Sequence, residues 1–166
     1  MEKDHAATAS NVEDVVRMLT VVTGPPASGK STWVRQQAKA GDIVIDFDTL
    51  ANALTVAEFD NHEHPRHLVN VAKAARTAAI GEALKHSTDV DVYLLHSTPG
   101  AEALRRYRRQ GARIVTIDPG EHIVRERCKR LRPSAMLPVV DRWYREQGDS
   151  HASDHVVSAS RRSREW

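Results

Sequence analysis

One stretch constrains this chain more than any other. The segment Gly24-Pro-Pro-Ala-Ser-Gly-Lys-Ser31 fits the spacing G-x-x-x-x-G-K-[ST] in full. Its glycines let the backbone curl closely around an anion, because no Cβ stands in the way. Successive amide groups then point inward, and a helix that follows adds the positive end of its dipole. The pattern is typical of a loop that cradles phosphate, in which Lys30 reaches the β- and γ-phosphates of a nucleotide and Ser31 binds Mg²⁺.

The residues on either side of this loop have the pattern that a phosphate-binding loop (P-loop) needs. Residues 18–23 form a short apolar run rich in β-branched side chains, which predicts a buried strand. Residues 30–40 predict a helix that ends near Gly41. A chance match to the motif is the competing interpretation, and the predicted strand and helix argue against it. For Ser28 and Thr32, a role limited to capping and helix formation is equally consistent with the sequence. The expected nucleotide contacts come from Gly24, Pro25, Pro26, Ala27, Ser28, Gly29, Lys30, Ser31 and Thr32.

The rest of the chain alternates between strand and helix patterns. Further strands are expected at 43–47, 90–95 and 113–117, and helices at 49–54 (a short turn), 68–85, 101–110, 121–131 and 138–147. Such alternation predicts an α/β fold, the three-layer P-loop NTPase type, with a parallel sheet of four or more strands, helices on both faces and a short arginine-rich lid. Because such sheets bind ligands beyond the carboxyl ends of their strands, we seek the chemistry there.

Length and composition set the domain organisation. With 166 residues and 40% hydrophobic residues, the chain is expected to form one domain. We assign residues 1–16 to a flexible arm, 17–147 to the P-loop domain and 148–166 to a flexible tail. The polar start of the chain, the absence of a long apolar run and the single Cys128 favour a cytoplasmic protein.

Positive charge is concentrated in one part of the chain. Residues 101–133 hold 10 Lys and Arg against 4 Asp and Glu, a net charge of +6, although the whole chain carries only +2. A polyanionic partner would explain this concentration, and so would a solvated helix face. For the four arginines within Arg105–Arg109, we favour the solvated face over binding to a nucleic-acid backbone.

The motif and its continuation resemble a known family. Residues 24–33 (GPPASGKSTW), followed by 43–48 (IVIDFD), are similar to the kinase domain of phage polynucleotide kinases and to related small AAA-type P-loop kinases of phages and their hosts. The similarity runs from about Thr20 to Tyr144. It implies a kinase that uses ATP and Mg²⁺ and acts on a nucleotide or nucleic acid, in the host cytoplasm if phage-encoded. No Asn-Lys-x-Asp sequence is present, which weakens a GTPase interpretation.

The resemblance assigns roles to two aspartates. In the family, an aspartate just after the second strand is the general base, and Asp48 matches it. A carboxylate at the end of a strand, facing the γ-phosphate, has the chemistry to deprotonate an acceptor hydroxyl. The alternative is that Asp48 only caps a helical turn that begins at Thr49. Asp46 is expected on the same strand face as Asp48, where it supports Mg²⁺ through water or serves as a structural acid.

The resemblance also implies arginines that cover the transferred phosphoryl group. Arg127, Arg130 and Arg132 fall in the matching segment after the fourth strand, and Arg130 fits best in register. Arg127 and Arg130 are therefore the expected catalytic arginines, because a planar guanidinium makes bidentate contacts with phosphate.

Two departures from the family put the acceptor in question. Ala51 stands where polynucleotide kinases have the arginine that clamps the acceptor phosphate, and His96 stands where they have an aspartate. The acceptor site is therefore not that of a standard 5′-end kinase. The resemblance permits a hydroxymethyl-pyrimidine within DNA, which needs no such clamp, beside a 5′-hydroxyl end. The alternatives are a small acceptor outside nucleic acids, a nucleoside monophosphate, or a regulatory ATP-binding protein without phosphotransfer.

Histidines form a further cluster at His62, His64 and His67. A metal site is one interpretation, and we favour a loop over the acceptor cleft. His96 is expected to contact the acceptor or the γ-phosphate, or to cap the following turn.

Overall fold

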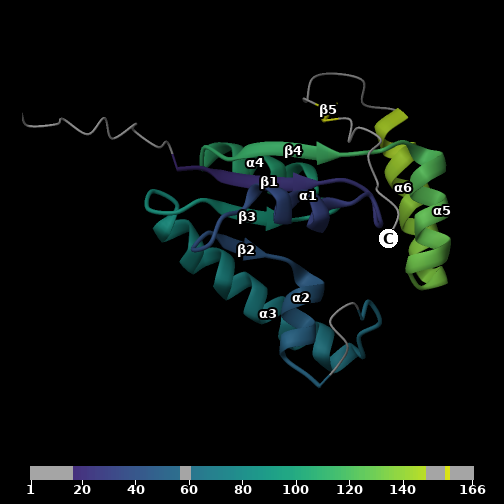
Figure 1. The fold of residues 1–166 in the computed structure, drawn as a ribbon, viewed down its shortest axis with the longest axis horizontal. Coiled ribbons are helices and arrows are strands. Elements are labelled where there is room, and N and C mark those ends of the chain that lie inside the picture. The colour runs from purple at the N-terminus through teal and green to yellow at the C-terminus, as the bar shows by residue number, and fades with distance from the viewer. Residues whose placement is uncertain (1–16, 57–60, 149–155, 158–166) are drawn as a thin grey trace, which may run out of the picture.

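The computed structural model of the chain describes residues 17–56, 61–148 and 156–157 (Figure 1). Its centre is one sheet in which each pair of neighbouring strands is parallel. The strand order is β2-β3-β1-β4-β5. The predicted parallel sheet is therefore confirmed. The strands are β1 (Leu19–Thr23), β2 (Ile43–Ile45), β3 (Val92–Leu95), β4 (Arg113–Ile117) and β5 (Val156–Val157).

Helices connect these strands, as parallel neighbours require. They are α1 (Lys30–Gln37), α2 (Phe47–Ala53), α3 (Arg66–Ala83), α4 (Ala101–Arg109), α5 (Glu121–Leu131) and α6 (Leu137–Gly148), with 3₁₀ turns η1 (Leu84–His86) and η2 (Ser134–Met136). The bounds of β4 and α5 are those predicted, whereas α1 stops short of the predicted Ala40 and β3 begins at Val92, later than predicted.

Alternate residues of the strands build a core on each face of the sheet. On one face Leu19 and Val21 pack with Tyr107 of α4 and Ala83 of α3. On the other face Val22 and its neighbours pack against Val34 of α1, which is 1% exposed. The β-branched run predicted as a buried strand is thus covered on both faces, which explains its lack of polar alternation.

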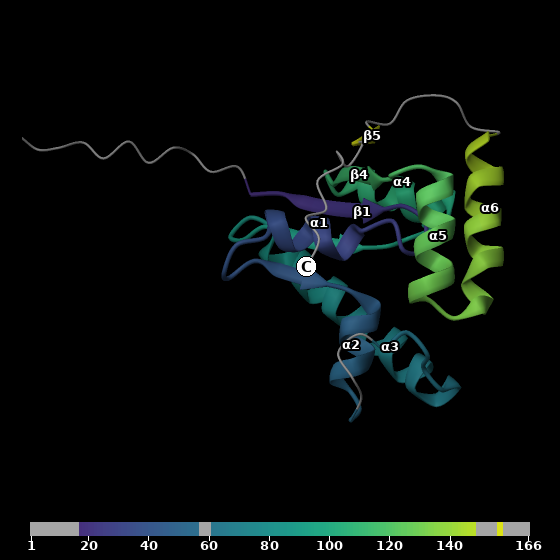
Figure 2. The same cartoon turned by 45° about the vertical axis from the view of Figure 1, so that its right-hand side comes forward.

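A third cluster joins α5 and α6. Val124 and Cys128 of α5 pack with Val140 of α6, and Ala27 of the P-loop rests against them. Figure 2 shows the two helices running antiparallel at the end of the molecule to which the strands point. The helix pair therefore lies next to the P-loop.

Two helix predictions need correction. Helix α3 begins at Arg66, directly after Pro65, rather than at Leu68, and it ends at Ala83 before η1. Val71, an apolar residue within this helix, is 55% exposed. The buried positions are Leu68, Ala72 and Ala83, because the helix is turned toward α2 and β2 along a stripe of four-residue spacing.

The second predicted strand also ends early. We expected a strand over residues 43–47, but β2 stops at Ile45 and Phe47 is the first residue of α2. Asp46 lies between them as the N-cap, with its side chain accepting a hydrogen bond from the Asp48 amide at 3.2 Å. Capping thus ends the strand where the apolar pattern alone would have continued it.

The predicted termini lie largely outside the described residues. This holds for the arm at 1–16 and for most of the tail at 148–166. Within the tail, Gly148 belongs to α6, and Val156 and Val157 pair with Thr116 and Ile117 of β4. In the described part of the chain, no helix combines the length and the apolar character that crossing a membrane requires.

Candidate active site

Four loops with polar residues meet at the carboxyl ends of the strands. The P-loop follows β1, Asp46 follows β2, His96 follows β3 and Asp118 follows β4. Figure 1 shows α5 and α6 on one side of this edge and α2 on another. A ligand at the edge therefore meets the P-loop, the start of α2 and the helix α5, as parallel α/β sheets generally arrange.

The backbone of the P-loop is specific to its sequence. Gly24 has a φ of 132°, and a Cβ there would stand 2.2 Å from the carbonyl oxygen of Ile117. Its amide donates to the Ser97 carbonyl at 3.1 Å, which ties the loop to the segment after β3. Ala27 and Gly29 also have positive φ values, of 61° and 99°. Such turns aim successive amide groups to one side, the arrangement that binds anions.

The loop ends in a helix with free amide donors. Gly29 is the N-cap of α1 and makes no side-chain cap, and the first intrahelical bond runs from the Trp33 amide to the Gly29 carbonyl. The amides of Lys30, Ser31 and Thr32 precede that bond and have no carbonyl one turn earlier. Of the other predicted contacts, Pro25 and Pro26 lack an N–H and contribute only the shape of the loop.

The Lys30 side chain is buried within the loop. Its Nζ donates to the carbonyl oxygens of Pro25 at 2.7 Å and Gly24 at 3.0 Å, and lies 3.5 Å from Oγ of Ser28. Its pKa is lowered from 10.5 to about 8, mainly by burial and also by the positive charge of Arg132, whereas the negative charges of Asp46 and Asp48 act in the opposite direction. The negative charge of a bound phosphate would stabilise the charged form of this buried amine.

Ser31 and Asp46 form a direct link between the P-loop and α2. The Ser31 hydroxyl donates to Oδ2 of Asp46 at 2.8 Å, while Oδ1 of Asp46 caps α2. Hydroxyl and carboxylate oxygens are the ligands that Mg²⁺ prefers, and it binds through few protein oxygens with water and phosphate completing the shell. The pair fits the metal that the sequence predicts. However, Asp46 and Asp48 do not share a strand face, because the strand ends before both of them.

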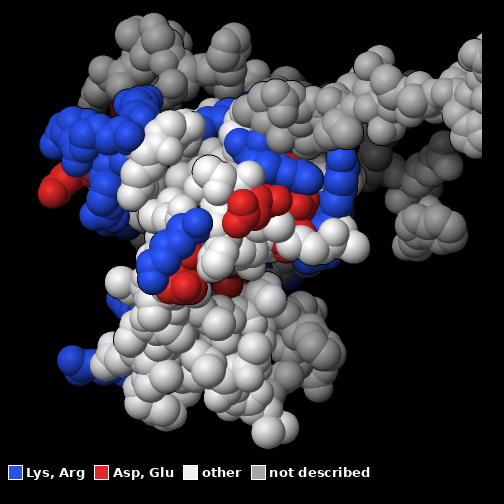
Figure 3. Space-filling view, turned by 90° about the vertical axis from the view of Figure 1, so that its left-hand side faces the viewer, with Lys and Arg blue, Asp and Glu red and all other residues white. Residues whose placement is uncertain are grey.

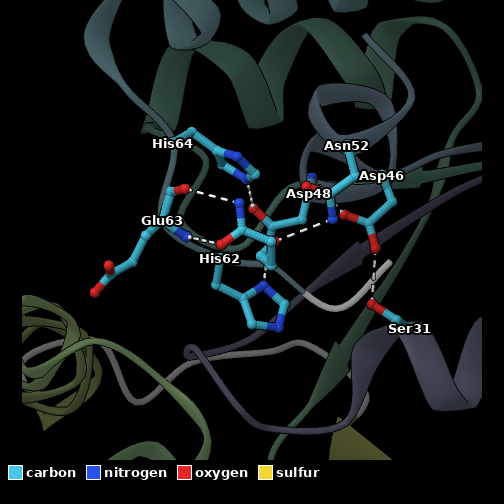
Figure 4. A network of polar contacts seen from close by, with 8 residues as sticks. Ser31, Asp46, Asp48, Asn52, His62, Glu63 and His64 are labelled. Carbon is cyan, nitrogen blue, oxygen red and sulfur yellow. Dashed lines mark hydrogen bonds and ion pairs between the residues drawn. The ribbon is translucent and has the colours of Figure 1, made fainter. Parts of the chain in front are cut away.

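Asp48 lies in the first turn of α2 and is held by two histidines (Figure 4). Nδ1 of His62 lies 2.6 Å from Oδ2, and Nε2 of His64 lies 3.2 Å from Oδ1. Figure 4 shows the two rings on opposite sides of the carboxylate. The residue that caps α2 is Asp46, and α2 begins at Phe47, so the alternative that Asp48 caps a turn beginning at Thr49 is wrong.

The loop that carries these histidines is braced by asparagines. The Asn61 side chain donates to the Glu63 carbonyl at 2.8 Å and accepts from the Glu63 amide at 3.0 Å. The buried Asn52 of α2 donates to the Asn61 carbonyl at 3.1 Å. These hydrogen bonds tie Asn61 and Glu63, the residues on either side of His62, to one another and to α2.

The third histidine of the predicted cluster is elsewhere. His67 is exposed on α3 and lines a hollow of about 400 Å³ with Leu54, Leu68 and Val71. Among the residues that the structure describes, no group of three or more His, Cys, Asp or Glu side chains is placed to hold a metal ion.

The arginines of α5 differ in their distance from the P-loop. A Cβ on Gly29 would stand 3.8 Å from Nη1 of Arg127, so this guanidinium lies over the loop. Arg132 is near enough to lower the pKa of Lys30. Arg130, the best match in register, is exposed. The roles expected for Arg127 and Arg130 remain predictions.

Helix α5 is itself anchored near the site. Arg125 pairs with Glu121 and with Asp141 of α6, and the Tyr144 hydroxyl donates to Asp118 at 2.7 Å. Burial, together with the hydrogen bond to Asp118, raises the pKa of Tyr144. These contacts hold the arginine-bearing helix against the end of β4.

At the end of β3, His96 is turned toward α4. Its Nδ1 lies 3.0 Å from the Tyr107 hydroxyl, and burial with the nearby cations Arg76 and Arg106 lowers its pKa to about 4. His96 is therefore neutral at pH 7, and it would meet a phosphate only as a neutral imidazole.

Sequence reasoning missed Arg76. This half-buried arginine of α3 donates from Nη2 to the Leu95 carbonyl at 2.8 Å, at the carboxyl end of β3. Burial lowers the pKa of Arg76, and Tyr107 and Asp46 act against that shift. The signal was available, since Arg76 falls on the same four-residue stripe as Leu68 and Ala72. A cation on the buried stripe of a helix is unusual unless it is paired, so its position in the sequence indicates a polar partner in the fold.

The arginine-rich α4 points away from the site. Because α4 leads from the end of β3 to the start of β4, its last turn approaches the amino ends of the strands. Figure 3 views the molecule from that side and shows Lys and Arg side chains gathered at the upper left and also in the middle, beside acidic side chains. The solvated helix face expected for Arg105–Arg109 stays a prediction.

Comparison with known protein families shows to which family the chain belongs. The sequence profile of the family described as an AAA domain (AAA_33) matches residues 19–135. The chain belongs to this AAA-domain family. It is a family of P-loop NTPases that includes kinases. The matched segment of this AAA-domain protein runs from β1 into η2, so it contains the P-loop, both aspartates and all the arginines of α5. A comparison with curated proteins gave no match.

Proposed function

We propose that this AAA-domain protein is a kinase that transfers the γ-phosphoryl group of ATP to a hydroxyl of a nucleotide or polynucleotide. One observation carries the proposal. The two carboxylates at the start of α2 have separate partners, since Asp46 accepts from Ser31 and Asp48 accepts from His62 and His64. A nucleotide-binding switch needs only the first carboxylate, whereas phosphoryl transfer to an alcohol also needs a group that orients or activates the nucleophile, and Asp48 with its two histidines has the chemistry for that role.

The donor side rests on the P-loop. The amides of Lys30 to Thr32 and the Lys30 ammonium would bind the phosphates of ATP, with Nζ turning from the carbonyl oxygens of Gly24 and Pro25. Ser31 and Asp46 would hold Mg²⁺, which supplies positive charge beside the β- and γ-phosphate oxygens. Arg127 and Arg130 are proposed to stabilise the charge of the transferred group.

The acceptor side rests on Asp48. Its negative charge opposes the lowering of the Lys30 pKa, and this interaction with a P-loop residue supports a role for the carboxylate beside the phosphates. The similarity to phage polynucleotide kinases supports a polynucleotide acceptor. Ala51 offers no clamp for a phosphate beside the reacting hydroxyl, which favours a hydroxymethyl-pyrimidine in DNA over a 5′-hydroxyl end.

The test is transfer of label from γ-labelled ATP in the presence of Mg²⁺. The acceptors are DNA and RNA with 5′-hydroxyl ends, hydroxymethyl-pyrimidine DNA, nucleosides, nucleoside monophosphates and a small sugar. We expect label on a polynucleotide, and none with Lys30→Ala. Label on a monophosphate or sugar would correct the acceptor class. Label on no acceptor, with ATP still bound, would replace the kinase by a regulatory ATP-binding protein.

A further inference from the structure

The hydrogen bonds around Asp48 determine where protons lie. A carboxylate only accepts hydrogen bonds, so each ring nitrogen that contacts ionised Asp48 must carry a hydrogen. Nδ1 of His62, which lies 2.6 Å from Oδ2, therefore carries a hydrogen. In the neutral ring, Nε2 then has a free lone pair. Nε2 of His64, which lies 3.2 Å from Oδ1, carries the hydrogen in that ring. The two rings thus present opposite tautomers to one carboxylate.

The two histidines also differ in their access to a ligand. The His64 side chain is only 3% exposed, contacts the Phe47 ring edge-on, and has no hydrogen-bond partner at Nδ1 among the described residues. It is buried too deeply to meet an acceptor. The His62 side chain is 24% exposed, and its hydrogen bond among the described residues is the one from Nδ1 to Asp48. Of the two rings, His62 is the one that a bound hydroxyl can reach.

The loop holds His62 in this position. Asn61 fixes both backbone groups of Glu63, and Asn52 of α2 fixes the Asn61 carbonyl. Pro65 keeps the residue before it extended and serves as the N-cap of α3. The His62 ring is therefore oriented from both ends, by its own loop and by Asp48. A base held by a hydrogen-bonded carboxylate is the arrangement that generally activates a weak nucleophile.

We propose that Nε2 of His62, and not a carboxylate oxygen of Asp48, takes the proton of the acceptor hydroxyl, while Asp48 holds the ring. The proposal rests on the proposed kinase function. In the step, the acceptor O–H bond breaks and its proton moves to Nε2. The acceptor oxygen bonds to the γ-phosphorus, and the bond from that phosphorus to the β–γ bridging oxygen breaks. ADP leaves with that electron pair, and His62 later releases the proton to water.

The chemistry of imidazole favours this assignment. Imidazole is the side chain that most often serves as a general base, and a neutral ring has one basic nitrogen that can accept the proton. Asp48 then stabilises the imidazolium that forms, as a carboxylate partner of a catalytic histidine does. On this view His64 and Asn61 are positioning residues, because they act through Asp48 and through the loop.

The experiment compares His62→Asn and His62→Ala with the unaltered protein and Asp48→Asn. The side-chain amide nitrogen that His62→Asn introduces can occupy the place of Nδ1 and still donate to Asp48, but it is not basic. We expect His62→Asn to lower kcat by roughly 100-fold or more, the usual contribution of a general base. ATP affinity and the melting temperature should stay unchanged. Imidazole added to His62→Ala should restore a concentration-dependent part of the rate. The exposed His122→Ala serves as the control and should behave as the unaltered protein does.

The outcomes distinguish a failure of the His62 assignment from a failure of the kinase function. If His62→Asn transfers label within about threefold of the parent rate while Asp48→Asn does not, Asp48 is itself the base and only this inference falls. A large loss in both His62 variants without imidazole rescue also overturns the inference, since His62 then merely positions Asp48. If the unaltered protein labels none of the acceptors of the panel, the kinase function itself is rejected.

Nitrogen-15 NMR of the histidine rings adds a readout without any acceptor. Neutral His62 should carry its hydrogen on Nδ1, and the opposite tautomer would contradict the proposal.

Discussion

The Ser31 hydroxyl donates a hydrogen bond to Asp46 at 2.8 Å, and this bond joins the end of the P-loop to the N-cap of α2. One carboxylate thereby serves two purposes, since its other oxygen accepts from the Asp48 amide. The two purposes can be separated, because asparagine caps helices about as well as aspartate does but lacks the negative charge.

Replacing Asp46 by Asn and by Ala should therefore give different results. Asp46→Ala removes the cap and should lower the free energy of unfolding by about 1 kcal/mol, whereas Asp46→Asn should stay close to the parent. Both should weaken the dependence of ATP binding on Mg²⁺. Urea denaturation and ATP titration with and without Mg²⁺ provide the measurements. Equal Mg²⁺ dependence in the parent and both variants would remove Asp46 from the metal site.

Gly24 should tolerate no side chain. Its φ of 132° and the 2.2 Å approach to the Ile117 carbonyl oxygen both oppose a Cβ. We expect Gly24→Ala to destabilise the fold by about 3 kcal/mol or more. Gly111→Ala is the matched control, because Gly111 has a φ of 73° with nothing within 4 Å of its built Cβ. That variant should lose only about 1 kcal/mol. Similar losses in thermal unfolding would show that the close approach is absent.

The pKa of Lys30 makes stability depend on pH in a defined window. Its folded pKa of about 8 lies below the ordinary 10.5, so between these values the unfolded chain keeps a proton that the folded chain has lost. Stability contributed at this site should therefore rise with pH from about 8 to 10.5, by about 3 kcal/mol in total. The measurement is the difference in unfolding free energy between the parent and Lys30→Met at several pH values. If the difference in unfolding free energy between the parent and Lys30→Met stays constant from pH 8 to 10.5, the pKa of Lys30 is not lowered by burial.

The α5 arginines should contribute unequally to ATP binding. Arg127 lies over Gly29, so Arg127→Ala should weaken ATP affinity roughly tenfold, the value of a hydrogen bond to a charged group. Lys129→Ala removes the same charge from an exposed position of the same helix and should change affinity little. Titration calorimetry makes the comparison. If Lys129→Ala weakens binding as much as Arg127→Ala, the helix acts only through its net charge.

The sequence predicted the backbone around the P-loop better than the contacts at the start of α2. The P-loop motif is a continuous stretch whose conformation is dictated by Gly24, Gly29 and Lys30, and the β-branched run before it needed no long-range information. The start of α2 was placed wrongly because Phe47 extends an apolar pattern, while the cap at Asp46 that ends β2 has no periodicity.

The contacts of Asp48 could not be predicted from spacing. His62 and His64 reach it from a loop 14 and 16 residues away, through a brace of Asn52 and Asn61 that no short motif predicts. Arg76 lies farther still from the residues that it meets at the end of β3. Such pairs depend on how α2 and α3 pack, which only the folded chain reveals.

The most direct test of the account measures ATP binding and phosphoryl transfer on the same samples of the parent, Lys30→Ala and Asp48→Asn. The account predicts that the parent moves γ-label to a hydroxyl acceptor, that Lys30→Ala does neither efficiently, and that Asp48→Asn binds ATP with parental affinity but transfers at least roughly 100-fold more slowly. Transfer by Asp48→Asn at the parental rate would contradict the division of the site into a donor half and an acceptor half.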